Sequence, residues 1–288
     1  MTALTAFDLD DSGKIDLNGI YDRPDPRDYY QTLINLEYRI PDEAAPVFRS
    51  VIDGMRSVRG SNTLTILDVG CSYGVNSAIL KHGQSMPELF SAYSARQCGA
   101  LSRQELITRD RDFYRSGSGD RDLRIVGLDV AARAVGYARQ AGILDGGVSA
   151  DLETRPPTPE ETALLAPTDL VTSTGAIGYV GAPTFDHILD ACSRQPWFAL
   201  FALRMFPVDA IAATLASRGY AVFKLAGRTF KQRRFAGRTE FNEVLANLDT
   251  LGIDPARLET EGWYHAEFYF ARPEGEAAPP PISDLVRM

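Results

Sequence analysis

Residues 63 to 74, which read TLTILDVGCSYG, decide the fold. The first half is a short, apolar, β-branched run of the kind that forms a strand buried on both faces. The second half is a turn of small residues, and the stretch VNSAILKHG that follows it suits a helix. The pattern predicts a strand, a tight turn and a helix, with backbone close to a ligand at the carboxyl end of the strand.

The same alternation of strand and helix continues through the middle of the chain. Helix-compatible stretches separate four further strand-like runs, which are RIVGLDV at 124–130, GGVSADL at 146–152, TDLVTSTG at 168–175 and WFALFALRMF at 197–206. Strands that read as continuous hydrophobic runs belong to parallel sheets with helices on both faces. The sequence therefore predicts a doubly wound α/β fold.

Length and composition fit one globular domain with additions. The chain has 288 residues, of which 44% are hydrophobic and 24% charged. A formal net charge of -8 provides no positive field to collect a polyanion, so broad nucleic-acid binding is disfavoured. The three cysteines are far apart in sequence, which predicts reduced thiols. No apolar run reaches about 18 residues and the N-terminus is acidic, so we expect a cytoplasmic protein without a membrane partner.

The glycine turn differs from two common phosphate-binding loops. A dinucleotide fold would show GxGxxG, and a P-loop would need Gly-Lys-Ser/Thr. Here Asp68 lies two residues before Gly70, and the next glycine is Gly74. An acid at the tip of the strand would repel pyrophosphate but could accept an ammonium group. These residues favour a ligand that carries a positive charge.

This order of residues resembles the class I S-adenosylmethionine-dependent methyltransferases. The first motif of that family is an acid-x-Gly-x-Gly-x-Gly turn after the first strand, matched here by Asp68, Gly70, Cys71, Ser72 and Gly74. Ser72 is a departure, because it occupies the position of the middle glycine. The resemblance covers residues 64 to 206. It implies S-adenosyl-L-methionine as cofactor and a seven-stranded sheet whose last strand runs antiparallel between the fifth and sixth.

Three further features of the family have counterparts in the same order. The resemblance implies that an acid after the second strand binds the ribose hydroxyls, that an acid after the third contacts adenine, and that the loop after the fourth lies near the sulfonium. The corresponding residues are Asp129 with Val130, Asp151 with Leu152, and Ser173 with Thr174. Taken alone, Asp129 also fits a helix N-cap and Asp151 a solvated loop acid.

Methyl transfer from a sulfonium is an in-line displacement, so the protein must hold the acceptor lone pair opposite sulfur in a dry pocket. His265 opens the last strand at the end that faces the crevice, which makes it the candidate general base. Tyr179, a second catalytic candidate, and Arg204 are expected to line the pocket. The alternatives are a histidine without chemistry, a tyrosine in core packing and an arginine in a surface ion pair.

Two inserts interrupt the predicted domain, which spans residues 61–272. Residues 81–122 connect the first helix to the second strand along the amino edge of the sheet, so we expect packing or oligomer surface there. Residues 228–262 look basic and helical, and the resemblance implies that they lie at the carboxyl edge as a substrate lid. Arg233 and Arg234 in this insert are candidates to bind an anionic or carrier-bound acceptor. A solvated charged face is the alternative.

Residues 1–60 form an N-terminal extension. Tyr21, Tyr29 and Tyr30 stand among prolines there, and we expect an aromatic flap over the cofactor, with a structural wrap as the alternative. The stretch from Asp8 to Asp16 imitates a calcium loop, but Gly19 replaces the bidentate Glu, so no metal site is predicted. The Pro-rich residues 273–288 are expected to be flexible.

The sequence thus predicts metal-independent methyl transfer from S-adenosyl-L-methionine to O or N of a small molecule. A binding or regulatory protein that holds the cofactor without transferring its methyl group is one alternative. An RNA-modifying methyltransferase that uses the basic insert is another, although nucleic acid is the less expected partner. A homodimer is left open.

Overall fold

The structure, a computed structural model, describes residues 18 to 277 and residue 284. The calcium-like stretch from Asp8 to Asp16 lies outside these residues, as do Pro279, Pro280 and Pro281 of the C-terminal tail. Among the residues described, no helix combines the length and the apolar character needed to cross a bilayer.

The centre of the molecule is an eight-stranded mixed sheet of order β3-β2-β1-β4-β5-β8-β6, with β7 paired to β8. The strands are β1 (Leu64–Val69), β2 (Leu123–Leu128), β3 (Gly146–Val148), β4 (Leu170–Thr174), β5 (Trp197–Leu203), β6 (Tyr220–Lys224), β7 (Phe230–Arg234) and β8 (Trp263–Pro273). Strands β1 to β5 are parallel, and β8 runs antiparallel between β5 and β6. This arrangement confirms the predicted doubly wound fold and the place of its last strand.

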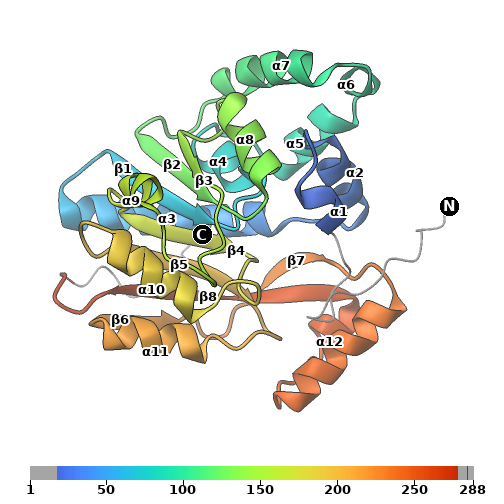
Figure 1. Cartoon of the computed structure of the whole chain (residues 1–288). Helices are drawn as coiled ribbons and strands as arrows, with labels where there is room; N and C mark the ends of the chain where they lie inside the picture. The colour runs from blue at the N-terminus through green and yellow to red at the C-terminus, as the bar shows by residue number, and fades with distance from the viewer. Residues whose placement is uncertain (1–17, 278–283, 285–288) are drawn as a thin grey trace.

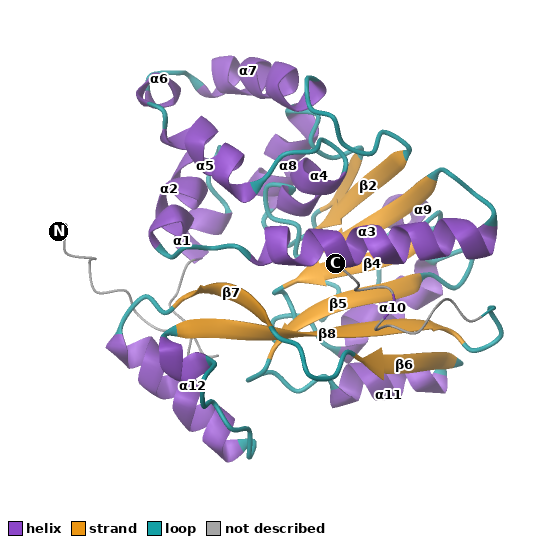
Figure 2. Ribbon diagram, turned by 180° about the vertical axis from the view of Figure 1, so that it is seen from behind, coloured by secondary structure: helices purple, strands orange, loops and turns teal. Residues whose placement is uncertain are grey.

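Helices cover both faces of the sheet (Figures 1 and 2). The helices are α1 (Asn18–Tyr21), α2 (Arg27–Asn35), α3 (Ile40–Arg59), α4 (Val75–Leu80), α5 (Met86–Ser94), α6 (Arg96–Gly99), α7 (Arg103–Arg115), α8 (Ala132–Gln140), α9 (Pro159–Leu165), α10 (Ala182–Ala191), α11 (Asp209–Ser217) and α12 (Arg238–Thr250). Helices α3, α4 and α8 pack in the core of one face, and α9, α10 and α11 in that of the other. All six residues of β1 and all seven of β5 are buried, as a sheet covered on both faces requires.

The crevice of this fold follows from the strand order. The chain moves from β1 outward to β2 and β3, and then returns to add β4 on the other side of β1. In open α/β sheets, ligands bind at such a reversal, outside the carboxyl ends of the strands. Registration of Asp68 with Gly127 in β2 and Thr172 in β4 brings the ends of these three strands together.

The first insert, residues 81–122, was expected along the amino edge of the sheet, but it also extends to the N-terminal segment. It leaves and returns at the amino edge, where the amide of Asp120 donates to the carbonyl of Leu80. Helices α5 to α7 then extend to α2, and the ring of Tyr93 stacks on Tyr30 at a centroid distance of 4.3 Å. Capping boxes at Ser85 and Ser102 begin α5 and α7. The insert therefore packs against helix α2 of the N-terminal segment.

The second insert begins with a strand, although its sequence looks basic and helical. β7 pairs antiparallel with β8 and adds an eighth strand where seven were expected, and only then does α12 follow. The N-terminal segment binds this strand, because the amide of Arg39 donates to the carbonyl of Gln232 at 2.8 Å and that of Arg234 to Leu36 at 2.7 Å. Two regions that are distant in sequence thus meet at the carboxyl edge.

The start of the C-terminal tail is held against the body of the protein. Glu276 accepts hydrogen bonds from Arg59 and from the indole of Trp197, and the amide of Glu274 donates to Gly219. These contacts fix residues that directly follow β8, and most of the tail that was expected to be flexible lies outside the described residues.

Candidate functional site

A cavity of about 410 Å³ lies at the carboxyl ends of β1, β2 and β4. Its volume falls in the range of small-molecule sites, which is about 300 to 1,000 Å³. The N-terminal segment and β7 also line it, contributing Tyr21, Tyr29, Gln232 and Arg233. No residue of the first insert, 81–122, lines it.

The glycine turn folds tightly at the tip of β1. Gly70, Ser72 and Gly74 all have left-handed backbone, with φ angles of 74°, 47° and 79°. A Cβ at Gly70 would collide with Ala176 in the loop after β4, so only glycine allows these two turns to touch. Ser72 takes a conformation that costs a non-glycine residue about 1 kcal/mol, a strain typical of ligand sites. Its amide in return donates to Asp129 Oδ2 at 2.8 Å.

Asp68 lies beneath the floor of the cavity and is 1% exposed. Its Oδ1 accepts hydrogen bonds from Asn76 Nδ2 at 2.8 Å and Thr172 Oγ1 at 2.9 Å, while Oδ2 has no partner. Burial raises the pKa of this carboxyl to about 6. Asn76 and Thr174 separate it from the open cavity and are themselves joined by a 3.1 Å hydrogen bond. At neutral pH the site therefore holds a buried negative charge that no cation balances among the described residues.

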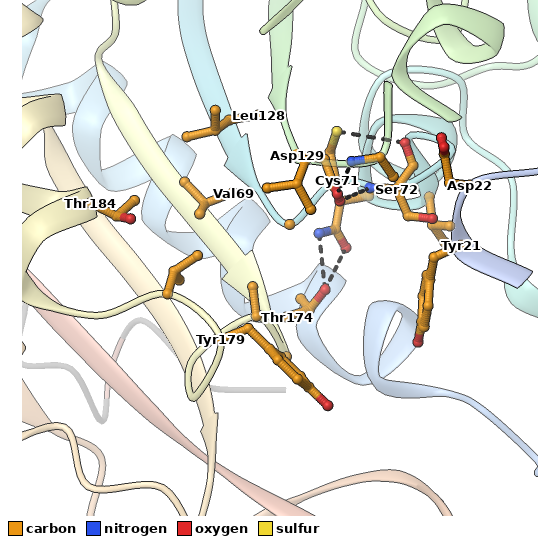
Figure 3. A pocket seen from close by; sticks show the side chains of 18 of the residues that line it. Tyr21, Asp22, Val69, Cys71, Ser72, Leu128, Asp129, Thr174, Tyr179 and Thr184 are labelled. Carbon is orange, nitrogen blue, oxygen red and sulfur yellow. Dashed lines mark hydrogen bonds between the residues drawn. The ribbon is translucent and has the colours of Figure 1, made fainter. Parts of the chain in front are cut away.

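Asp129 lies on the cavity wall beside the turn. Its Oδ1 accepts from the amide of Ala131 at 2.9 Å, and burial raises the pKa of its carboxyl. The neighbouring Val130 is apolar yet 69% exposed, which leaves an uncovered hydrophobic surface at the cavity. In Figure 3, Asp129, Ser72 and Asp22 lie in the upper part of the view, and Thr174 and Tyr179 lie below them.

Asp151 and Leu152 line the same end of the cavity as Asp129. Asp151 is exposed, and its Oδ1 accepts from the amide of Glu153 at 3.0 Å. Leu152 is buried beneath it. The structure thus brings together the acids after the first three strands. Of the other residues of the predicted motifs, Gly70, Cys71, Ser72 and Thr174 line the cavity, whereas Gly74 and Ser173 do not.

Tyrosines form the other end of the cavity. Tyr21 and Tyr29 line it as expected, and their rings meet edge to face at 5.6 Å. Tyr30 does not line it, because its ring is turned into the core against Tyr93. Tyr179 stands at the rim with 51% of its surface exposed. An aromatic wall of this kind suits an apolar or cationic ligand.

The two arginines expected to bind an anion already have protein partners. Arg233 lines the cavity, but it is buried and forms a bidentate ion pair with Glu240 at 2.7 and 2.9 Å. Arg234 lies outside the cavity, pairs with Glu37 at 2.9 Å and covers the ring of Trp263. The two arginines expected to bind an anion are therefore paired with glutamates in the fold.

His265 and Arg204 lie away from the cavity lining. His265 Nδ1 is 2.9 Å from Thr229 Oγ1, and its pKa is lowered to about 4 by burial, with Lys231 and Arg204 adding to the effect. Arg204 pairs with Glu259 at 2.5 Å and donates to the carbonyl of Asp254. Neither position gives direct contact with a ligand in the cavity, so the geometry does not favour the expected roles of base and pocket residue.

Five polar lining residues were not anticipated from sequence, and they are Asp22, Tyr38, Asn76, Thr184 and Gln232. Asn76 lies in the first turn of α4, directly after the glycine turn, so its position in the sequence could have identified it as a cavity residue. Asp22 Oδ1 accepts from the amide of Arg133 at 2.6 Å and joins the N-terminal segment to the start of α8. Gln232 lies on β7, a strand that was not predicted because the sequence around it looks basic and helical.

Comparison with models of protein families gives no match, and comparison with curated protein sequences gives none either. Among solved structures, the plantazolicin methyltransferase BpumL in complex with SAH is similar, with a TM-score of 0.43, 11% identity, and coverage of 89% of this chain and 93% of that one.

Two further similar structures cover most of both chains. Magnesium protoporphyrin IX methyltransferase from Synechocystis PCC 6803 with bound SAM gives a TM-score of 0.38 and 15% identity over 85% of this chain and 84% of that one. The YcgJ protein from Bacillus subtilis gives 0.41 and 11% over 79% and 100%. Likeness at this level assigns no function, which has to come from the cavity.

Proposed function

We propose that the protein is an S-adenosyl-L-methionine-dependent methyltransferase that acts on a small molecule. The observation that carries this proposal is the set of acids around one cavity, in which Asp68 is buried without a balancing cation and Asp129 and Asp151 follow on the next two strands. A ligand with a positive charge at one end and a ribose and base at the other matches this set.

The residues present fit that cofactor. The buried charge of Asp68 would attract the ammonium end of the cofactor across Asn76, whose Oδ1 lies on the cavity side as an acceptor for that group. The carboxylate of Asp129 would accept from the ribose hydroxyls, and the apolar surfaces of Val130 and Leu152 would contact the base, with Asp151 at its edge. Bound there, the cofactor would supply an electrophilic methyl group on a sulfonium.

The chain's own contribution to the reaction would be positioning. In-line displacement needs an acceptor held in line with the methyl group and shielded from water. Tyr21, Tyr29 and Tyr38 surround the remaining part of the cavity, and Tyr179 stands at its mouth, where it would contact the acceptor. A role for residues 228–262 as a lid is supported by the contribution of β7 to the wall.

Incubation of the protein with methyl-labelled S-adenosyl-L-methionine and a metabolite extract tests the proposal. We expect label in a small-molecule product and release of S-adenosylhomocysteine. Binding of the cofactor without any labelled product would instead indicate the non-catalytic binding protein. Label in RNA would indicate the third function, which the pairing of Arg233 and Arg234 with glutamates disfavours.

The affinity for S-adenosylhomocysteine should depend on pH through Asp68. Its pKa is about 6 because of burial, and a cationic ligand binds the ionised form, so affinity should be constant above pH 6 and fall about tenfold per unit below it. Calorimetric titrations from pH 5 to 8 measure this, since the ligand's ammonium group stays protonated throughout. An affinity that is flat to pH 5 would show that Asp68 does not bind the charge.

A further inference from the structure

We infer that the methyl acceptor is an amine, which the tyrosine-lined end of the cavity binds beside Gln232. The inference rests on the proposed function and goes beyond it by naming the class of substrate. Three independent features of the cavity support it, namely its lack of a base, its charge and the unpartnered amide of Gln232.

Three carboxylates line the cavity, but Asp129 and Asp151 lie at the cofactor end and Asp22 accepts from the amide of Arg133. Apart from these, the described lining residues include no group suited to remove a proton from an acceptor near neutral pH. They contain no histidine or lysine, and the only thiol is that of Cys71, whose pKa burial raises. The pKa values of Tyr29 and Tyr38 are also raised by burial, so both phenols remain neutral. An alcohol is a poor nucleophile without a base, whereas the lone pair of an unprotonated amine attacks directly.

The charge of the lining favours a cation over an anion. Asp22, Asp129 and Asp151 line the cavity, and Asp68 lies beneath it. The single lining guanidinium, that of Arg233, is neutralised by Glu240 within the part of the chain that the structure describes. A carboxylate or phosphate acceptor would thus find no free cation among these residues. An ammonium group would find the carboxylate of Asp22 and the faces of the tyrosines, while the other acids serve the cofactor end.

Gln232 offers a polar contact inside this wall. Its side chain is 95% buried, since 5% of its surface is exposed, and Oε1 has no hydrogen-bond partner among the described residues. A Cβ at Gly175 would lie 2.5 Å from Gln232 Nε2, so the glycine makes room for the amide next to Thr174. A buried amide oxygen without a hydrogen-bond donor costs free energy unless a ligand supplies one. An acceptor that presents N–H groups would do so.

The step balances without a catalytic base. The amine loses a proton to water before it binds in its reactive form, and its lone pair then forms the nitrogen–carbon bond. The carbon–sulfur bond breaks, and its electron pair stays on sulfur, which becomes neutral. The positive charge passes to nitrogen and remains among the acids and tyrosine faces, and an N–H proton leaves to water after release.

Three probes of similar shape test the inference, namely 2-phenylethylamine, 2-phenylethanol and 3-phenylpropanoate. Each is titrated at millimolar concentration into the full chain saturated with S-adenosylhomocysteine. The amine should bind at least about tenfold more tightly than the other two. Gln232→Leu should weaken amine binding about tenfold and Gln232→Glu should strengthen it, with cofactor affinity unchanged, whereas Gln104→Leu on exposed α7 is the matched control.

The outcomes separate the two proposals. A failure to bind S-adenosylhomocysteine contradicts the proposed function itself. If that ligand binds but the amine shows no preference over its analogues, including the case in which none of the three binds, the acceptor inference is wrong. It is also wrong if Gln232→Leu and Gln104→Leu bind the amine equally well.

Discussion

Asp68→Asn should abolish tight cofactor binding while leaving the fold at least as stable as before. The asparagine keeps an oxygen for the hydrogen bonds from Asn76 and Thr172 but removes the buried charge. Loss of an attraction of about 3 kcal/mol between this buried charge and the ligand's ammonium group corresponds to an affinity lowered about 100-fold. Calorimetric titration with S-adenosylhomocysteine measures the first effect and urea unfolding the second.

The stability effect has a definite sign. A carboxyl whose pKa is raised to about 6 in the folded state binds protons more tightly there than in the unfolded chain, where the value is 3.8. The free energy of unfolding therefore falls as pH rises from about 4 to 6, and stays lower above that. Asp68→Asn should remove this dependence and raise the free energy of unfolding at pH 8 by about 1 to 3 kcal/mol. Asp53→Asn, at an exposed site, is the control.

A variant that is destabilised and still binds the ligand with unchanged affinity would reverse both expectations. Asp68 would then be a structural acid of the strand end. Its charge would then neither lower the free energy of unfolding nor increase the affinity for the cofactor.

Glu240→Ala should destabilise the protein more than any other single change considered. It leaves the guanidinium of Arg233 buried without its bidentate partner, and removal of one member of a buried ion pair costs about 3 to 5 kcal/mol. The amide of Ala236 also loses its acceptor. Because Arg233 lies on β7 at the cavity, binding of S-adenosylhomocysteine should weaken as well. Urea unfolding and calorimetry measure the two effects.

The double variant Arg233→Met, Glu240→Leu separates the pair from its surroundings. Replacement of both charges by apolar groups of similar volume should recover most of the stability lost in Glu240→Ala. If the double variant were as unstable as the single one, the cost would come from packing of α12 rather than from an unpaired charge. Arg234→Met, which affects an exposed pair with Glu37, should change the free energy of unfolding by less than about 1 kcal/mol.

The sequence predicted the cofactor end of the site much better than the acceptor end. Asp68 lies near the end of an apolar strand and Asp129 and Asp151 follow the next two, and a parallel sheet necessarily brings such positions to one edge. Local pattern and topology are enough to place them. The burial of Asp68 beneath Asn76 and Thr174 could not be predicted in this way, because it depends on how the glycine turn and α4 pack against β4.

The acceptor end depends on contacts between distant segments, which no local pattern reports. Gln232 and Arg233 lie on β7, a strand rich in basic residues. Arg233 pairs with Glu240, and Lys231 and Arg234 lie over the ring of Trp263, contacts that the local sequence does not reveal. Tyr30 was expected in the cavity, but the first insert takes its ring into the core. His265 faced the crevice by its position on the last strand, yet the pairing of β7 with β8 covers it.

Titration of the purified protein with S-adenosylhomocysteine, beside its Asp129→Asn and Asp186→Asn variants, tests the central claim most directly. Asp129 lines the cavity, whereas Asp186 pairs with Arg218 at the surface. We predict sub-millimolar binding that Asp129→Asn weakens at least about tenfold and Asp186→Asn leaves unchanged. Absence of binding by the unaltered protein, or equal binding by all three, would contradict the assignment of this cavity to S-adenosyl-L-methionine.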